Sequence, residues 1–242
     1  MQEVYLYQTV HILGGRSLHL TAHLAVLDRW SRELFGRPAG FRQQPLARQI
    51  EALAAQTAPA DCDLSQFVRI VVPAPGDPAF RLESAGISLY RGYDLRSLMP
   101  DAATLQYDMP FPEAPTSARE AAAGLARQQA RLHGASVAVR CDGDGIVRTA
   151  DDAPLFAVRG KTAFVSPAEA CVERELGLRA VEAAGLELEE RPVMRDELPR
   201  FDELFYVDHR GVTALAHCDG HPCMAILAER VAQSLGGLFP KM

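Results

Sequence analysis

Side-chain amines are scarce in this chain, and that scarcity limits the covalent chemistry it can do. Among the 242 residues there are 23 arginines but only two lysines, Lys161 and Lys241. A lysine amine can form an imine with a carbonyl compound, whereas a guanidinium cannot do so at physiological pH. Lys161 follows a glycine in a sequence typical of a hairpin turn, and Lys241 is next to last. Both contexts are typical of solvated lysines.

Cysteines and histidines gather once, in the heptad from His217 to Cys223 (HCDGHPC). Two thiols and two imidazoles could supply nitrogen and sulfur ligands to zinc. Such ligands normally come from two separated turns, and a heptad containing Pro222 does not easily wrap around one ion. We therefore favour a hairpin turn here and predict no metal ligands.

Other catalytic or binding patterns are weak. The segment Asp142–Gly145 (DGDG) suggests calcium, but it lacks the twelve-residue loop and closing glutamate of an EF-hand, so a hairpin turn is the better interpretation. His19, His23 and Asp28 have no identifiable nucleophile with which to form a catalytic triad. A glycine-rich phosphate loop of the GxxxxGK[ST] type is also missing from the sequence.

Composition narrows the class of protein. The net charge of −6 argues against general binding to nucleic acid or to anionic membranes. The N-terminus does not have the pattern of a signal peptide, and no apolar run is long enough to span a bilayer. Five scattered cysteines without a CxxC pair suggest free thiols. We expect a cytoplasmic protein that binds neither nucleic acid nor a membrane.

The elements that must position any site fall into two blocks. The sequence of the first half predicts strands at 4–12, 67–72 and 86–90. It also predicts two helices, one at 21–35 with Thr21 as its cap and one at 45–56. Three prolines in residues 108–115 suggest a linker. We expect a small N-terminal α+β domain over residues 1–110, a Pro-rich linker over 111–116 and a larger C-terminal α+β domain over 117–242.

The second half is more regular. Ser117 and Glu120 have the spacing of a capping box, which predicts a helix to about residue 133. Strands are expected at 136–141, 146–149, 155–158 and 162–165, then a helix over 167–184, a strand at 187–190 and a short helix at 195–198. Two more strands, 204–207 and 212–217, and a helix over 223–235 complete the chain. Because strands and helices come in blocks, we expect an α+β fold with mainly antiparallel sheets.

Four segments in the correct order resemble the class IV aminotransferases, a family of fold-type IV enzymes that use pyridoxal 5′-phosphate (PLP). YQTVHILGGRSLHLTAHLAVL is similar to the family pattern FETVRVxxGxxLxxHLxRL. GASVAVRCDGDGIVRTADDAPLFAVRGKTAFVSP, CVERELGLRAVEAAGLELEERPV and DELFYVDHRGVTALAHCDG resemble the later patterns. The resemblance covers about residues 5–35 and 117–235. It implies the two-domain architecture of D-amino acid aminotransferases and a homodimer.

The resemblance also assigns residues to the family's PLP site. The Schiff-base lysine matches Thr116, and the glutamate beside the pyridine nitrogen matches Thr149, with Asp151 and Asp152 nearby. The phosphate-binding arginine matches Val26, although Arg29 stands three residues further on and could reach the same space. These matches leave the Schiff-base lysine, the pyridine-nitrogen glutamate and the phosphate-binding arginine of the family without their usual side chains.

The remaining matches concern the phosphate loop and its neighbour. The family loop GITR corresponds to Cys171–Arg174, so the resemblance places Val172, Glu173 and Arg174 beside the phosphate, and Glu173 brings a negative charge there. A pocket between the domains is expected near Thr116, Thr149, Arg174 and Asp208.

Three functions remain open. One is a catalytically silent relative that binds a small molecule and has no cofactor, with PLP implied by resemblance only. Another is an active PLP-dependent branched-chain or D-amino acid aminotransferase, or an aminodeoxychorismate lyase, whose lysine lies elsewhere. The last is a lysine-independent enzyme that reuses the cleft through Thr116, Arg174 or Asp208. We favour the first.

Overall fold

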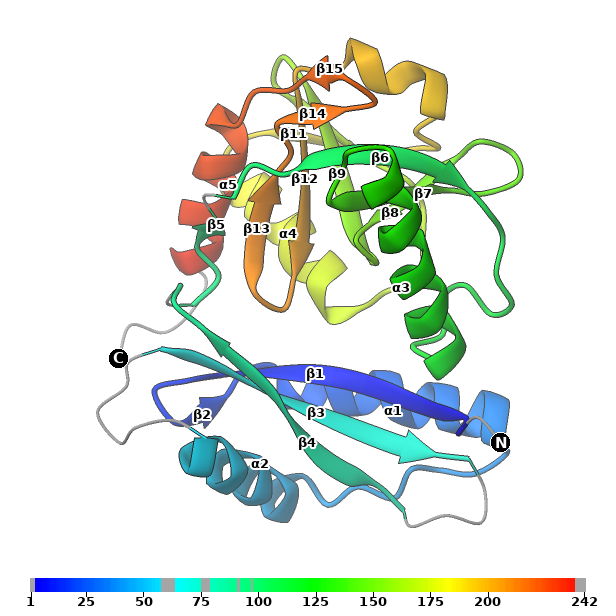
Figure 1. The fold of residues 1–242 in the computed structure, drawn as a ribbon. Coiled ribbons are helices and arrows are strands. Elements are labelled where there is room, and N and C mark those ends of the chain that lie inside the picture. The colour runs from blue at the N-terminus through cyan, green and yellow to red at the C-terminus, as the bar shows by residue number, and fades with distance from the viewer. Residues whose placement is uncertain (1–2, 58–63, 75–78, 91, 97, 238–242) are drawn as a thin grey trace. The chain divides into compact units, whose positions relative to one another are not determined.

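The computed structural model describes residues 3–57, 64–74, 79–90, 92–96 and 98–237, and its contacts divide the chain into two compact units. The first contains the described residues up to Gly92 and the short segment Glu113–Glu120. The second contains Tyr93–Pro112 and the described chain from Ala121 onward. Both units combine helices with sheets, as Figure 1 shows, so the predicted α+β class is confirmed.

The first unit is a four-stranded antiparallel sheet with two helices on one face. Its strand order is β2-β1-β3-β4, and its elements are β1 (Tyr5–Leu13), β2 (Arg16–Ser17), α1 (Leu20–Phe35), α2 (Gln43–Thr57), β3 (Ser65–Pro73) and β4 (Arg81–Ser88). Side chains alternate across a strand, so Leu6, Val10 and Ile12 of β1 face the helices and join Leu27 and Ile50 in one buried core. Tyr5 and Tyr7 therefore lie on the opposite face of β1.

A larger, strongly curved sheet forms the second unit. Its main path runs β15-β14-β6-β7-β8-β9-β12-β13-β5, while β10 pairs with β9 and β11 pairs with β10. The strands are β5 (Leu95–Arg96), β6 (Asp101–Gln106), β7 (Val137–Cys141), β8 (Val147–Ala150), β9 (Ala153–Arg159), β10 (Thr162–Val165), β11 (Glu187–Glu190), β12 (Glu203–Asp208), β13 (Gly211–Ala214), β14 (His217–Cys218) and β15 (His221–Pro222). Most of the described strand pairs are antiparallel, as predicted.

Helices cover this sheet by close packing. They are α3 (Ser117–Leu132), α4 (Val172–Ala183), the short 3-10 helix η1 (Arg195–Arg200) and α5 (Ile226–Gly237). Small residues bring α3 onto β6 and β7, where Ala126 and Ala130 pack against Ala103 and Ala138. Gly177 brings α4 against β9, because a Cβ atom at that position would lie 2.5 Å from the ring of Phe156.

Several predicted boundaries were wrong for local reasons. Helix α1 has His19, not Thr21, as its N-terminal cap, and His19 takes a left-handed backbone conformation there (φ 51°). Helix α4 begins at Val172, after an irregular segment, rather than at residue 167. Strands β5 and β6 were not predicted, and they join the second unit by pairing with β13 and with β7 and β14.

These two strands explain why the contact-based division differs from the expected boundary near residue 110. Pairing of β5 and β6 carries the chain from Tyr93 onward into the second sheet. The proline-rich segment then returns to the first unit, where Ala114 is fully buried and the Tyr7 N–H donates to the Pro115 carbonyl (2.9 Å). The segment 113–116 is thus packed structure within that unit.

Candidate functional site

Thr116 stands at the start of α3, where it caps the helix. Its hydroxyl accepts a hydrogen bond from the Arg119 N–H (3.1 Å), and its carbonyl accepts one from the Glu120 N–H (3.1 Å). Thr116 is 7% exposed and forms an isolated antiparallel bridge with Leu6. The predicted cap at Ser117 was therefore wrong by one residue, since Ser117 is already helical.

A compact polar cluster lies beside this cap within the first unit. The Glu120 carboxylate accepts two hydrogen bonds from the Arg69 guanidinium (2.8 and 2.5 Å) and a third from the Tyr5 hydroxyl (2.8 Å). The Arg69 guanidinium also lies over the Tyr7 ring, 4.0 Å from its centroid. Cation–π contact and a two-pronged ion pair together fix Arg69 on the face of β3 opposite α1 and α2. We call these four residues the Arg69 cluster.

Asp208 ends β12 in the second unit and sits among charged groups. One carboxylate oxygen accepts from Arg96 (3.2 Å) and the other from the Arg210 N–H (2.7 Å). Its side chain is 15% exposed. Burial raises the pKa of Asp208, and the Arg96 guanidinium opposes that rise.

The neighbours of Asp208 are also perturbed by burial. Burial raises the pKa of Tyr93, and the negative charges of Glu173 and Asp208 raise it further. Burial lowers the pKa of His209 to about 3, with the charges of Arg210 and Arg96 acting in the same direction. At neutral pH this region therefore holds an uncharged imidazole and a protonated phenol beside the Arg96–Asp208 pair.

The loop that the resemblance places at a phosphate contains one usable cation, and that cation is already paired. Arg174 is 3% exposed, and its guanidinium donates to Glu190 at 2.5 Å. Glu173 lies in the first turn of α4, where a carboxylate interacts favourably with the helix dipole. Val172 is buried in the same turn. A phosphate bound near this helix end would have a like charge, that of Glu173, in the same turn.

Thr149 lies on β8, opposite Arg140 on β7 and Pro154 on β9, and it is partly buried. The neighbouring Asp151 and Asp152 form the turn between β8 and β9, with left-handed φ values of 48° and 67°. Asp151 also accepts a hydrogen bond from Arg127 (3.1 Å). Both aspartates thus belong to the turn that connects β8 to β9.

Arg29 and Lys161 are both on the surface of their elements. Arg29 is exposed on α1, and its guanidinium lies 5.2 Å from the centroid of the Trp30 ring. Val26 packs against the core of the first unit. Lys161 is exposed in the turn between β9 and β10, and Lys241 lies outside the described residues.

The two segments considered for metal binding form turns. The His217–Cys223 segment makes the β14–β15 hairpin, and the Asp142–Gly145 segment makes the turn before β8. Within the described chain, no group of three or more His, Cys, Asp or Glu side chains could hold an ion.

Two pockets of the second unit, of about 360 and 460 Å³, lie by this hairpin. Their linings contain none of the predicted site residues. The predicted grouping of Thr116 with Thr149, Arg174 and Asp208 stays a prediction.

The sequence profile of amino-transferase class IV matches residues 5–208. The chain belongs to the class IV aminotransferase family. Solved structures that have low sequence identity to this chain share its fold. The branched-chain amino acid aminotransferase of Escherichia coli superposes with a TM-score of 0.78 at 17% identity, covering 98% of this chain and 85% of the other.

Two further structures agree with that match. A hypothetical aminotransferase from Mycobacterium tuberculosis, bound to α-ketoglutarate and PMP, gives a TM-score of 0.74 at 16% identity and covers 97% and 90% of the two chains. The branched-chain aminotransferase of Thermoproteus uzoniensis, solved with norvaline, gives 0.76 at 17% identity, with coverage of 96% and 84%. No curated protein matches this family member in sequence. The predicted fold-type IV architecture is confirmed.

The described part of the chain also contains no helix long and apolar enough to cross a membrane.

The sequence analysis did not identify the Arg69 cluster or the Arg96–Asp208 pair, apart from Asp208 itself. Their partners are 51 and 112 residues apart, and no local pattern links such residues. The alternation of aromatic residues along β1 was the one available signal, because it placed Tyr5 and Tyr7 on one face.

Proposed function

We propose that this family member does not form a Schiff base with PLP and that it uses the fold to bind a small molecule. The observation that carries the proposal is the role of Thr116. This residue matches the family's lysine and here supplies the hydroxyl that caps α3. A hydroxyl cannot form an imine.

The other residues at matched positions do not fit the cofactor either. Thr149 offers no carboxylate to a pyridinium nitrogen. Glu173 places a negative charge at the helix end where the phosphate would lie, and Arg174 is already paired with Glu190. Each of these substitutions weakens a different part of PLP binding, so together they support the proposal more strongly than one alone.

An active PLP-dependent aminotransferase or lyase is the alternative, and it is favoured by the fold. Similar solved structures include a hypothetical aminotransferase from Mycobacterium tuberculosis in its PLP-bound form and a branched-chain amino acid aminotransferase complexed with N-(5′-phosphopyridoxyl)-L-glutamate. That function would need Lys161 or Lys241 as the imine-forming residue. The position of Lys161 in an exposed turn argues against it.

A PLP titration followed by absorbance tests the proposal. We expect wild-type protein to show no imine band and to retain no cofactor after borohydride reduction and denaturation. Thr116→Lys is expected to gain both signals if the matched position faces the cofactor. Lys161→Arg serves as the control for adventitious labelling of the exposed turn.

The wild-type result decides the matter even if Thr116→Lys folds poorly. A reduced PLP adduct on the wild-type chain, located by peptide mass spectrometry on either lysine within the native fold, would overturn the proposal. The homodimer implied by the resemblance is part of the same proposal, and light scattering of the purified protein tests it.

A further inference from the structure

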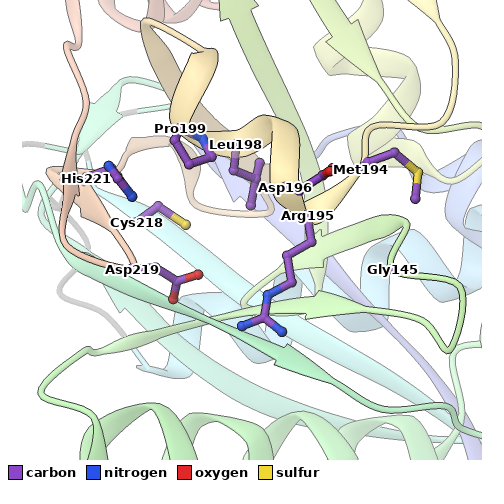
Figure 2. Close-up of a pocket in the computed structure, with 9 residues that line it drawn as sticks. All are labelled: Gly145, Met194, Arg195, Asp196, Leu198, Pro199, Cys218, Asp219 and His221. Atoms are coloured by element: carbon purple, nitrogen blue, oxygen red, sulfur yellow. The ribbon is translucent and has the colours of Figure 1, made fainter.

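The two pockets of the second unit share part of their lining. Arg195 and Asp219 border both of them, so the pockets adjoin on either side of these two residues. Their volumes, about 360 and 460 Å³, are within the range of about 300–1,000 Å³ that is common for small-molecule sites. The smaller one is drawn in Figure 2, between η1 and the β14–β15 hairpin.

One pocket has a largely apolar wall. Leu198 and Pro199 of η1 line one side, and Cys218 lies near them on the hairpin (Figure 2). Met194, just before η1, lines the pocket further away, beyond Arg195. Burial raises the pKa of the Cys218 thiol, so this side chain is neutral at physiological pH and behaves as a small apolar group. This wall suits an aliphatic or aromatic side chain.

Arg195 supplies a cation that no described residue pairs with. The side chain is exposed and extends from η1 into the space between Asp219 and Gly145, as Figure 2 shows. Among the residues that the structure describes, its guanidinium makes no hydrogen bond or ion pair, although its backbone N–H donates to the Gly145 carbonyl (2.9 Å). All the donors of the guanidinium thus remain available to a ligand carboxylate.

The second pocket shares Arg195 and Asp219 with the first and adds the carboxylate of Asp101. Asp219 has both carboxylate oxygens held by Thr104, one by the backbone N–H (2.9 Å) and one by the hydroxyl (2.5 Å). The Asp101 carboxylate is hydrogen-bonded to the His217 imidazole, with 2.7 Å between Oδ1 and Nδ1. His133 and Gly134, just beyond the end of α3, also line this pocket, at the helix end that carries partial negative charge.

We propose that these adjoining pockets bind a free α-amino acid with an apolar side chain. The carboxylate pairs with Arg195, the ammonium group lies toward Asp219 and Asp101, and the side chain packs against Leu198 and Cys218. This site is independent of the proposed loss of Schiff-base chemistry, because none of its residues matches a PLP position.

Charge balance favours a zwitterion over simpler ligands. A carboxylic acid without an amine would pair with Arg195 but would approach Asp101 and Asp219 with a like charge. An amine without a carboxylate would leave the Arg195 guanidinium unpaired and would place the ligand's positive charge close to it. Only a ligand with both charges and an apolar side chain complements the Arg195 cation, the two carboxylates and the apolar wall.

Isothermal titration calorimetry with L-leucine and L-phenylalanine tests the site. We expect at least one of them to bind wild-type protein at millimolar concentration, and Arg195→Gln to weaken that binding at least about tenfold. The matched control is Arg200→Gln, because Arg200 is an exposed arginine of the same short helix that lines neither pocket. It should change the affinity less than about twofold.

Analogues of leucine separate the charge requirements. We expect 4-methylpentanoate, which lacks the amine, and 3-methylbutylamine, which lacks the carboxylate, to bind at least about tenfold more weakly than L-leucine. The proposal is wrong if neither amino acid binds the wild type, if Arg195→Gln binds as well as Arg200→Gln, or if one analogue binds as tightly as L-leucine. Circular dichroism of both variants verifies their folding.

Discussion

At the scale of single residues, the hydroxyl of Thr116 has a structural role as the cap of α3. It satisfies the Arg119 N–H, one of the backbone donors that the first turn of a helix leaves without an intrahelical partner. Because Thr116 is buried, water cannot easily replace that interaction. The side chain at this position therefore contributes to stability whether or not it contacts a ligand.

Thr116→Ala should lower the free energy of unfolding by about 1 kcal/mol, the usual effect of losing a side-chain cap. Thr116→Ser keeps the oxygen and should lose much less. Urea denaturation followed by circular dichroism measures both. Equal stability of the alanine and serine variants would contradict the capping role.

His209 predicts a pH dependence of stability. Its pKa in the folded protein is lowered to about 3, while the unfolded chain titrates near its ordinary value of about 6.5. Between these values the unfolded state binds more protons, so the free energy of unfolding should fall as pH falls through this window, by at most about 1.4 kcal/mol per unit. His209→Gln should flatten that slope.

Denaturant midpoints from pH 7 to pH 4 test this expectation. His133→Gln is the matched control, because His133 is exposed beyond the end of α3. An unchanged slope in His209→Gln, or an equal flattening in the control, would show that His209 is not the group responsible.

Residue roles were only partly predictable from the sequence. The pattern Ser117-x-x-Glu120 looks like a capping box, yet the preceding threonine is the cap and Glu120 is drawn to Arg69. Two adjacent hydroxyls offer nearly the same local signal, so only the path of the backbone decides between them. The Arg69 partner comes from a strand 51 residues away.

At the scale of elements, a buried carboxylate joins β12 to α5. Glu203 is 1% exposed, and its oxygens accept hydrogen bonds from the Leu227 N–H (2.8 and 3.0 Å) and the Ala228 N–H (2.8 Å). These N–H groups belong to the first turn of α5, where the helix dipole also favours a negative charge. Glu203 therefore anchors the last described helix to the sheet.

Glu203→Ala should lower the free energy of unfolding by roughly 2–3 kcal/mol, because buried N–H groups lose a charged acceptor. Glu203→Gln keeps one acceptor oxygen and should cost less. Thermal unfolding of the two variants tests the order. Glu229→Ala, a substitution in the same helix with no role in the cap, is the control.

Gly211 marks a close approach of β13 to the chain before β5. Its φ of 126° is unfavourable for other residues, and a Cβ atom there would lie 2.4 Å from the Asp94 carbonyl oxygen. Since the obstacle is backbone, Gly211→Ala should destabilise the fold by about 2 kcal/mol or more. Gly220→Ala shares a positive φ but has open space, so it should cost only about 1 kcal/mol.

Chemical denaturation of both glycine variants distinguishes backbone crowding from conformational strain alone. Equal losses would show that contact with Asp94 is unimportant.

Elements with local signals were predicted well, and those defined by distant partners were not. The hairpins of β7–β8 and β9–β10 carry glycines in their turns, and the helices carry apolar spacing, so both were found. Strand β6 was missed because its stability comes from parallel pairing with β7 on one side and β14 on the other. Neither neighbour is adjacent to it in sequence.

At the scale of the whole molecule, the two units have separate buried cores. Trp30 lies in the core of the first, and Cys141 and Cys218 lie in a core of the second. The order of motifs along the chain predicted the family architecture, whereas the domain boundary depended on β5 and β6. Fold assignment therefore came from ordered local patterns, and the boundary required tertiary contacts.

Cys141 and Cys218 should resist alkylation in the native protein. Both are nearly inaccessible, and burial raises the pKa of each thiol, that of Cys141 to about 11, so little thiolate is present. Cys171 is partly exposed and should react first among these three. Pulse labelling with iodoacetamide and peptide mass spectrometry measures the order. Rapid native labelling of Cys141 or Cys218 would show that this core opens readily.

The cap at Thr116 also bears on the history of this protein. If this position held lysine in an ancestor, as the proposed function implies, a reversion to lysine would remove the hydroxyl that Arg119 uses and would insert a longer, charged side chain at a nearly inaccessible position. A lineage regaining the amine would therefore lose stability before any catalytic benefit was selected. Such an asymmetry acts as an evolutionary ratchet, in which the return path needs a compensating mutation first.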